Sequence, residues 1–151
     1  MKKLFISLLA VLLLISLSGC ASTKKTVCTK TYSNGDVEKI TISSQKDKIV
    51  KVVDEDAYGG VDPTTADSLK AEKEELISPY NKIKGFNIRA TLNKAKDTLT
   101  YTYTIDFTKL DFDTFKKEME EFTHPVYNFA ADRLDLAGYI KGFEDSEFTC
   151  K

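Results

Sequence analysis

The sequence lacks the residue combinations that most enzyme and metal sites need. It has one histidine, His124, and a lone histidine has none of the companions required by a zinc site or a nucleophilic relay. No two cysteines form a C-x-x-C, no serine lies in Gly-x-Ser-x-Gly, and there is no glycine-rich phosphate loop. We therefore predict a protein that is not an enzyme, with no catalytic residue and no cofactor.

One alternative remains open, an enzyme of an unfamiliar type. Such an enzyme would need a concave pocket in which carboxylates converge and have shifted pKa values.

The chain also lacks an excess of basic residues. Lysine and arginine number 22 against 23 aspartate and glutamate residues, for a formal net charge of -1, and there is no large basic block. Because nucleic-acid binding depends on neutralising phosphates with positive charge, we expect no nucleic-acid partner.

The first twenty residues have the pattern of a lipoprotein signal. Lys2 and Lys3 precede an apolar run over 4–17, which is too short to span a bilayer as a permanent helix. Leu17-Ser18-Gly19-Cys20 then places small residues before a thiol that can carry lipid such as palmitate. We predict a signal peptide over 1–19, lipidation at Cys20, and a location on the extracytoplasmic face of the cell membrane, or on an outer membrane if the organism has one.

Removal of residues 1–19 from the 151-residue chain leaves 132 residues, enough for one compact domain. We predict a lipidated cysteine and short tether over 20–25 and one domain over 26–151. So short a tether keeps the domain close to the bilayer. The expected partners are the membrane, through the lipid, and an envelope protein or small ligand. An alternative hypothesis for the signal peptide is that its segment 12–19 is the precursor of a hydrophobic signalling peptide.

Two cysteines remain once Cys20 carries lipid. Cys28 lies near the start of the domain and Cys150 lies one residue from its end. An even pair in an exported protein suggests a disulfide. Two buried, unpaired thiols are the alternative.

Alternating apolar and polar residues predict strands over 26–32, 36–43 and 48–54, with a turn at Asn34-Gly35. The clearest alternation is in 86–92 and 98–107, which predicts a hairpin about Lys96-Asp97.

Asp62-Pro63 resembles a helix N-cap followed by proline in the first turn, and helical spacing follows it. We expect Pro79 to divide this helix and Gly85 to end it. Asp111 and Asp132 are expected to cap two further helices. These elements predict a single α+β domain, in which an antiparallel sheet of about five to six strands packs with two to three helices.

Asp54, Glu55 and Asp56 precede Gly59-Gly60 and are weak candidates for a metal site, because hard cations favour clustered carboxylates. As a calcium loop, however, the segment would place Tyr58 and Thr65 where ligands are needed. We therefore interpret it as a solvated acidic loop and predict no metal site.

The sequence resembles the YehR-type bacterial lipoproteins, small envelope proteins of uncharacterised function. The resemblance rests on the lipobox, the strand pairs near Thr41 and Val52, the segment 76–85, the strand that runs into 105–111, and the terminal 142–151. It implies an α+β lipoprotein domain and supplies no known active site.

Overall fold

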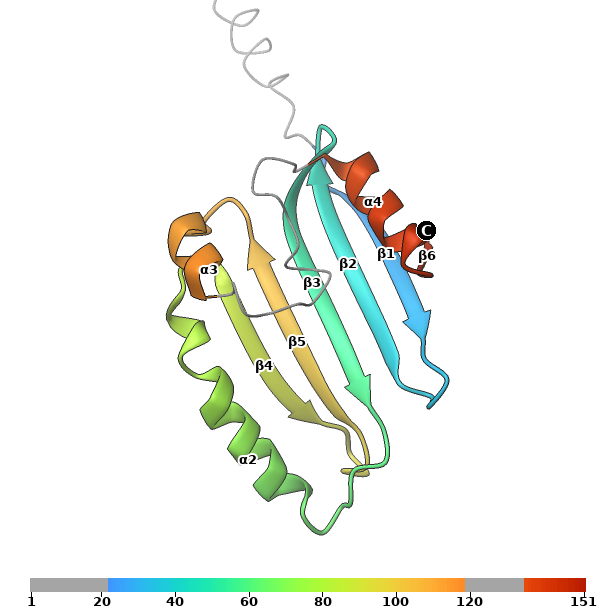
Figure 1. The fold of residues 1–151 in the computed structure, drawn as a ribbon, viewed down its shortest axis with the longest axis vertical. Helices are drawn as coiled ribbons and strands as arrows, with labels where there is room; N and C mark the ends of the chain where they lie inside the picture. The colour runs from blue at the N-terminus through green and yellow to red at the C-terminus, as the bar shows by residue number, and fades with distance from the viewer. Residues whose placement is uncertain (1–21, 119–134) are drawn as a thin grey trace, which may run out of the picture.

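The computed structural model describes residues 22–118 and 135–151, which form a six-stranded antiparallel sheet with three α-helices (Figure 1). The strand order is β4-β5-β3-β2-β1-β6. The predicted single α+β domain is confirmed. The strands are β1 (Lys24–Thr31), β2 (Val37–Gln45), β3 (Lys48–Tyr58), β4 (Phe86–Leu92), β5 (Leu99–Asp106) and β6 (Thr149–Cys150), and the helices are α2 (Ala66–Ile77), the 3₁₀ helix η1 (Tyr80–Lys82), α3 (Phe112–Glu118) and α4 (Leu136–Asp145).

The first three predicted strands are present, and they pair in sequence order as a meander. At the β1–β2 turn Gly35 has a φ of +91°, a left-handed conformation that glycine adopts without a Cβ clash. β1 begins earlier than expected, because Lys24 and Lys25 already pair with Ser44 and Ser43. The predicted tether over 20–25 is therefore wrong at its C-terminal end, where the chain is already part of the sheet.

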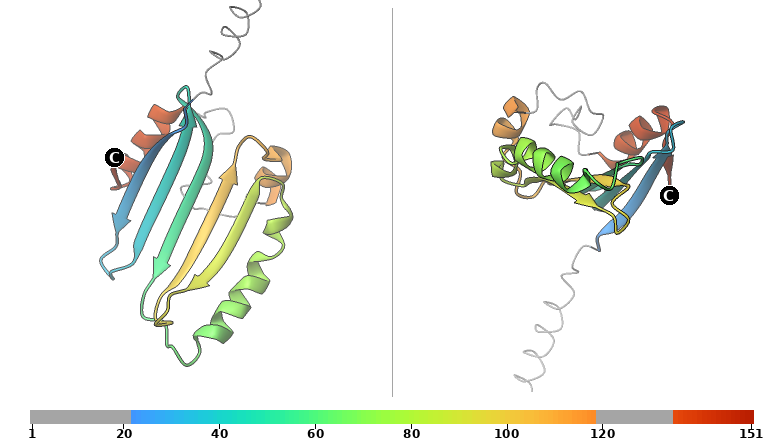
Figure 2. Two further views of the ribbon diagram at one scale, coloured as in Figure 1. Left: turned by 180° about the vertical axis from the view of Figure 1, so that it is seen from behind. Right: turned by 90° about the horizontal axis from the view of Figure 1, so that it is seen from below.

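The helices lie on one face of the sheet, with α2 and α3 beside β4 and α4 beside β1 (Figure 2). Alternate residues of the strands point to this face and form the core. The fully buried side chains include those of Ile40, Ile42, Val52 and Ile105. The opposite face is rich in threonine and carries ion pairs such as that between Lys39 and Glu55.

Helix α2 starts later than predicted. Asp62 does not cap it; the side chain of Asp62 instead accepts hydrogen bonds from the backbone N–H and hydroxyl of Thr64, both at 2.8 Å. The helix begins at Ala66 and ends at Ile77, two residues before Pro79, so the predicted division at this proline is confirmed.

Gly85 marks the turn from η1 into β4, as predicted. Its φ is +82°, and a Cβ at this position would lie 2.6 Å from the backbone N and Cα of Leu110. The backbone between η1 and β4 therefore packs directly against the segment that precedes α3.

The hairpin of β4 and β5 also forms as predicted, and β4 is an edge strand. At Ile88 the side chain of Asn81 makes the two backbone hydrogen bonds that a neighbouring strand would otherwise make. The Oδ1 of Asn81 accepts a hydrogen bond from the Ile88 N–H at 2.6 Å, and its Nδ2 donates to the Ile88 carbonyl at 2.9 Å.

The last two helices begin at aspartate caps. Asp111 accepts a hydrogen bond from the Thr114 N–H at 3.2 Å, as predicted. Helix α4 is capped by Asp135, which accepts from the Gly138 N–H at 3.0 Å. The predicted cap for this helix, Asp132, lies outside the described residues.

Candidate functional site

Three acidic side chains gather on the helix-bearing face of the sheet, in its middle strands. Glu38 of β2 lies opposite Asp56 of β3 in the strand register, and Ile40 lies opposite Asp54. The exposed fractions are 2% for Glu38, 0% for Asp54 and 6% for Asp56. One carboxylate oxygen from each residue lies within 4.8 Å of the others. The cluster is thus held by two paired strands within the buried layer of the domain.

The predicted solvated loop over 54–60 is wrong, because β3 continues to Tyr58. The segment pairs with β2 on one side and β5 on the other, so its backbone hydrogen bonds are made within the sheet. Because side chains alternate along a strand, the consecutive residues Asp54, Glu55 and Asp56 do not all lie on the same face of the sheet. Asp54 and Asp56 point to the core face, whereas Glu55 points away and forms an ion pair with Lys39 at 2.6 Å.

Burial strongly changes the acidity of the two aspartates. Loss of solvent raises the pKa of Asp54 to about 9, with further contributions from the charges of Asp56, Glu38 and Glu55. The same desolvation, followed by the charge of Glu38, raises the pKa of Asp56 to about 7. At neutral pH the Asp54 carboxyl is therefore protonated, and Asp56 is near the midpoint of its titration.

Tyrosines surround the carboxylates. The Tyr32 hydroxyl donates a hydrogen bond to Oε2 of Glu38 at 2.5 Å, and burial together with this contact raises the pKa of Tyr32 above its ordinary value. Burial raises the pKa of Tyr58 to about 12 and also raises the pKa values of Tyr103 and Tyr139. The phenol groups therefore stay protonated and can serve as hydrogen-bond donors.

A cavity of about 430 Å³ opens beside the cluster, between the β1–β2 turn and the end of β3. Glu38 and Asp56 line it, while the fully buried Asp54 does not. Tyr32 and Tyr58 also line it and are 41% and 44% exposed. The described residues that line it are Tyr32, Ser33, Asn34, Asp36, Val37, Glu38, Asp56, Ala57 and Tyr58.

The rim of this cavity is fixed by Asp36. Its Oδ1 accepts a hydrogen bond from the Gly59 N–H at 3.0 Å, and its Oδ2 accepts one from the Asn34 side chain at 2.7 Å. The Asp36 carbonyl also accepts from the Tyr32 N–H at 2.9 Å. The Asp36 side chain therefore connects the β1–β2 turn to the segment just after β3 at the rim of the cavity.

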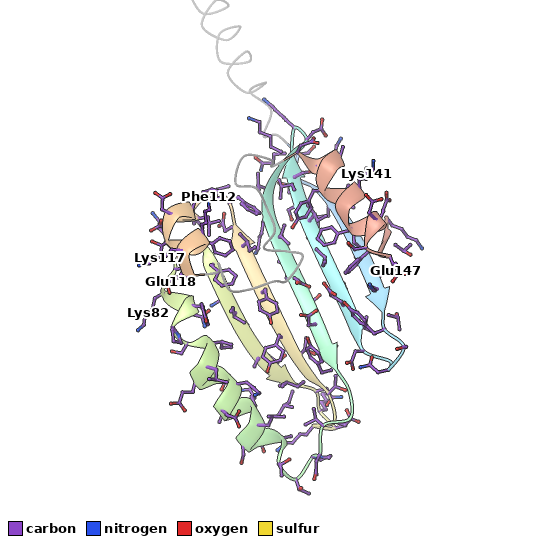
Figure 3. All side chains as sticks on the ribbon, in the orientation of Figure 1. Lys82, Phe112, Lys117, Glu118, Lys141 and Glu147 are labelled. Carbon is purple, nitrogen blue, oxygen red and sulfur yellow. A yellow bond between two sulfur atoms is a disulfide. The ribbon has the colours of Figure 1, made fainter. Side chains whose placement is uncertain are left out.

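The nearest base in the strand register, Lys30, contacts the C-terminal segment, and its ammonium also lies over the Tyr32 ring. Lys30 lies opposite Glu38, but its Nζ donates to the Ser146 carbonyl at 2.9 Å and lies 3.4 Å from Oε2 of Glu147. Glu147 is labelled just beyond α4 in Figure 3. Lys30 therefore ties the C-terminal segment to β1 and is not one of the cavity's lining residues.

The arrangement can bind cations and can exchange protons. Three carboxylates this close could share one cation, but a cation would first have to displace the proton of Asp54. A pKa of about 7 also suits Asp56 to proton transfer. The three-residue metal candidate of the sequence is revised, because Glu55 faces away and Glu38 takes its place. Glu38 was missed, although it continues the inward series of Ile40 and Ile42.

The predicted disulfide is present. Cys28 and Cys150 lie opposite each other in the pairing of β1 with β6, and their sulfurs are bonded across a sequence separation of 122 residues. Cys28 is fully buried. The bond fastens the C-terminal end of the chain to the first strand.

Other predicted features fall outside the described residues, namely the signal peptide over 1–19, Cys20 and His124. Among residues 22–118 and 135–151, no helix has both the length and the apolar character needed to cross a membrane.

Comparisons with known proteins identify structural relatives. The sequence matches no protein-family model and no curated protein sequence. An NMR structure of a protein from Streptococcus pneumoniae TIGR4 superimposes with a TM-score of 0.65 at 19% identity, covering 89% of this chain and 88% of that one. The NMR structure of Escherichia coli YehR gives a TM-score of 0.64 at 18% identity, covering 87% of this chain and 93% of YehR. The chain therefore has a YehR-like α+β fold.

Proposed function

We propose that this protein is a membrane-anchored cell-envelope lipoprotein whose domain binds a small ligand, without converting it, in the cavity lined by Glu38, Asp56, Tyr32 and Tyr58. The observation that carries the proposal is the cavity itself. It combines a preformed rim, aromatic walls and two carboxylates in a concave space, which is the composition of many ligand sites.

Ligand binding is tested by NMR titration of the protein purified in mild detergent, with its tyrosine rings isotopically labelled. A panel of small compounds of positive, neutral and negative charge is added, and saturable shifts of the Tyr32 and Tyr58 ring signals report binding at the cavity. Tyr58→Leu should weaken binding of any hit. Glu55→Gln, on the other face of the same strand, is the matched control. A panel in which no compound shifts these rings contradicts the binding proposal.

The anchor is supported by the lipobox that ends at Cys20 and by the strand β1, which begins only four residues later. Cys20→Ala should abolish lipid labelling and move the protein out of the membrane fraction. Ser22→Ala is the control, because it alters a residue just beyond the lipobox and leaves both disulfide cysteines in place. Unchanged labelling and fractionation of Cys20→Ala would contradict the anchor.

A second candidate is an acid–base enzyme. It is favoured by the pKa of about 7 at Asp56, in a cavity that also contains Glu38. The two candidates differ in the fate of the bound compound, which a binding protein releases unchanged and an enzyme releases as product. Turnover that Asp56→Asn abolishes would establish the enzyme, and recovery of the intact ligand after prolonged incubation would establish binding.

A further inference from the structure

In the part of the chain that the structure describes, the charged residues that line the cavity are all acidic. Asp36 lies at the rim, and Glu38 and Asp56 lie deeper, and none of the lining residues within 22–118 and 135–151 is a lysine or an arginine. An anionic ligand would bring like charge into a half-buried space, which costs free energy, whereas a cation would compensate charge already there. Charge alone therefore favours a positively charged ligand.

The aromatic walls narrow the class of cation. Tyr32 and Tyr58 present exposed rings to the cavity, and the Tyr58 ring is held edge-on by Tyr101 at a centroid distance of 5.9 Å. The Tyr32 ring already has the Lys30 ammonium 5.2 Å from its centroid. Such rings attract ammonium groups through their electron-rich faces. They also cover the apolar carbons of an organic ligand, which a bare metal ion does not have.

The size of the space agrees with a molecule larger than an ion. A volume of about 430 Å³ lies within the range of small-molecule sites. The strand register places the carboxylates beside an aromatic ring. Glu38 and Asp56 form one cross-strand pair, and Tyr58 is the next residue on that face of β3.

We propose that the ligand is a small organic cation whose ammonium group lies between the Tyr58 ring and the carboxylates of Glu38 and Asp56. This inference rests on the proposed function and deepens it by naming the ligand class.

The test uses four-carbon probes that differ in charge, namely putrescine, 1,4-butanediol and succinate, together with choline, CaCl₂ and MgCl₂. Binding to the protein in mild detergent is followed by calorimetry and by the tyrosine NMR signals. Putrescine or choline should bind saturably, with at least tenfold tighter affinity than 1,4-butanediol or succinate. Asp56→Asn and Glu38→Gln should each weaken binding at least tenfold, and Glu55→Gln should leave it unchanged.

Tyr58→Leu provides a second route, since this exposed residue can be changed without removing an acidic group. It should weaken choline binding at least fivefold while circular dichroism stays that of the parent protein. If 1,4-butanediol or succinate binds as tightly as putrescine, the cation inference fails and the binding proposal survives. If only calcium or magnesium binds, and Tyr58→Leu does not change that binding, the inference that the ligand is an organic cation is wrong. If no probe of any charge, and no compound of the wider panel, binds the cavity, both proposals fail.

Discussion

Asp54 and Glu55 are neighbours in sequence and lie on opposite faces of β3, so that Asp54 is fully buried while Glu55 forms an ion pair with Lys39 on the other face. Two adjacent carboxylates therefore have very different environments. This contrast provides a matched pair of variants for measuring what the buried acid contributes to stability.

We predict that the free energy of unfolding falls as the pH rises from about 4 towards 9. Below the ordinary pKa of 3.8, Asp54 is protonated in both states. Above it, the unfolded chain loses this proton while the folded protein keeps it up to a pKa of about 9, so stability decreases as the pH rises through this range. Asp56 adds to this slope up to about pH 7.

Denaturant unfolding between pH 5 and 8 measures this slope. Asp54→Asn should flatten it and raise stability at pH 8, whereas Glu55→Gln should leave it nearly unchanged. The groups that face Asp54 are Glu38, Asp56, Tyr103 and Tyr139, and they are kept in both variants. An equal slope in Asp54→Asn and the parent protein would refute the assignment.

Removal of the disulfide should destabilise the domain strongly. The bond spans 122 residues, and the chain-entropy model gives about 5 kcal/mol for a loop of this length, with measured losses of about 2–5 kcal/mol in small exported domains. The double variant Cys28→Ala/Cys150→Ala should therefore show a lower unfolding midpoint in denaturant. Mass spectrometry should show a gain of two hydrogen atoms when the parent protein is reduced, and a mass insensitive to reductant would contradict the bond.

Gly85→Ala should lower the free energy of unfolding by about 2–4 kcal/mol. The residue has a positive φ, and the added Cβ would meet backbone atoms of Leu110, which can move only with the chain. Gly59→Ala is the control, because nothing lies within 4 Å of a Cβ there. Thermal unfolding of the two variants compares them directly, and equal stability would contradict the close packing.

Asn81→Ala should cost about 1–2 kcal/mol, because it removes two hydrogen bonds to the backbone of Ile88. Asn87→Ala is the matched control, since the Asn87 side chain donates to Asn81 and leaves both hydrogen bonds between Asn81 and Ile88 in place. Hydrogen exchange at the Ile88 amide should accelerate in Asn81→Ala. An unchanged exchange rate would show that the Asn81 contact does not protect this amide.

The sequence predicted the hairpin of β4 and β5 because its pattern is local. Tyr101 and Tyr103 alternate with threonines, and side chains of opposite character on the two faces define a half-buried strand without knowledge of its neighbours. The disulfide between Cys28 and Cys150 could also be predicted, because a sequence with so few cysteines allows few possible pairings.

The acidic strand was missed because local preferences pointed the other way. Aspartate is unfavourable in strands and common before turns, and Gly59-Gly60 reinforced the loop interpretation. What decides the outcome is long-range pairing with β2 and β5 on both sides of residues 54–58. A signal was present, since Val52, Asp54, Asp56 and Tyr58 continue one alternation. The cavity depends on the same pairing and could not be read from the sequence.

The hydrogen bonds of Asn81 to Ile88 have a further consequence for how molecules meet one another. An edge strand with free backbone groups is a template on which another chain can add a strand and begin aggregation. At Ile88 both backbone groups are already occupied by a side chain of the same molecule. On the far side of the sheet, the two-residue β6 is held by a covalent bond to β1. Two copies of this domain that come into contact would meet at edges that are partly closed, and this protects the sheet from growing between molecules.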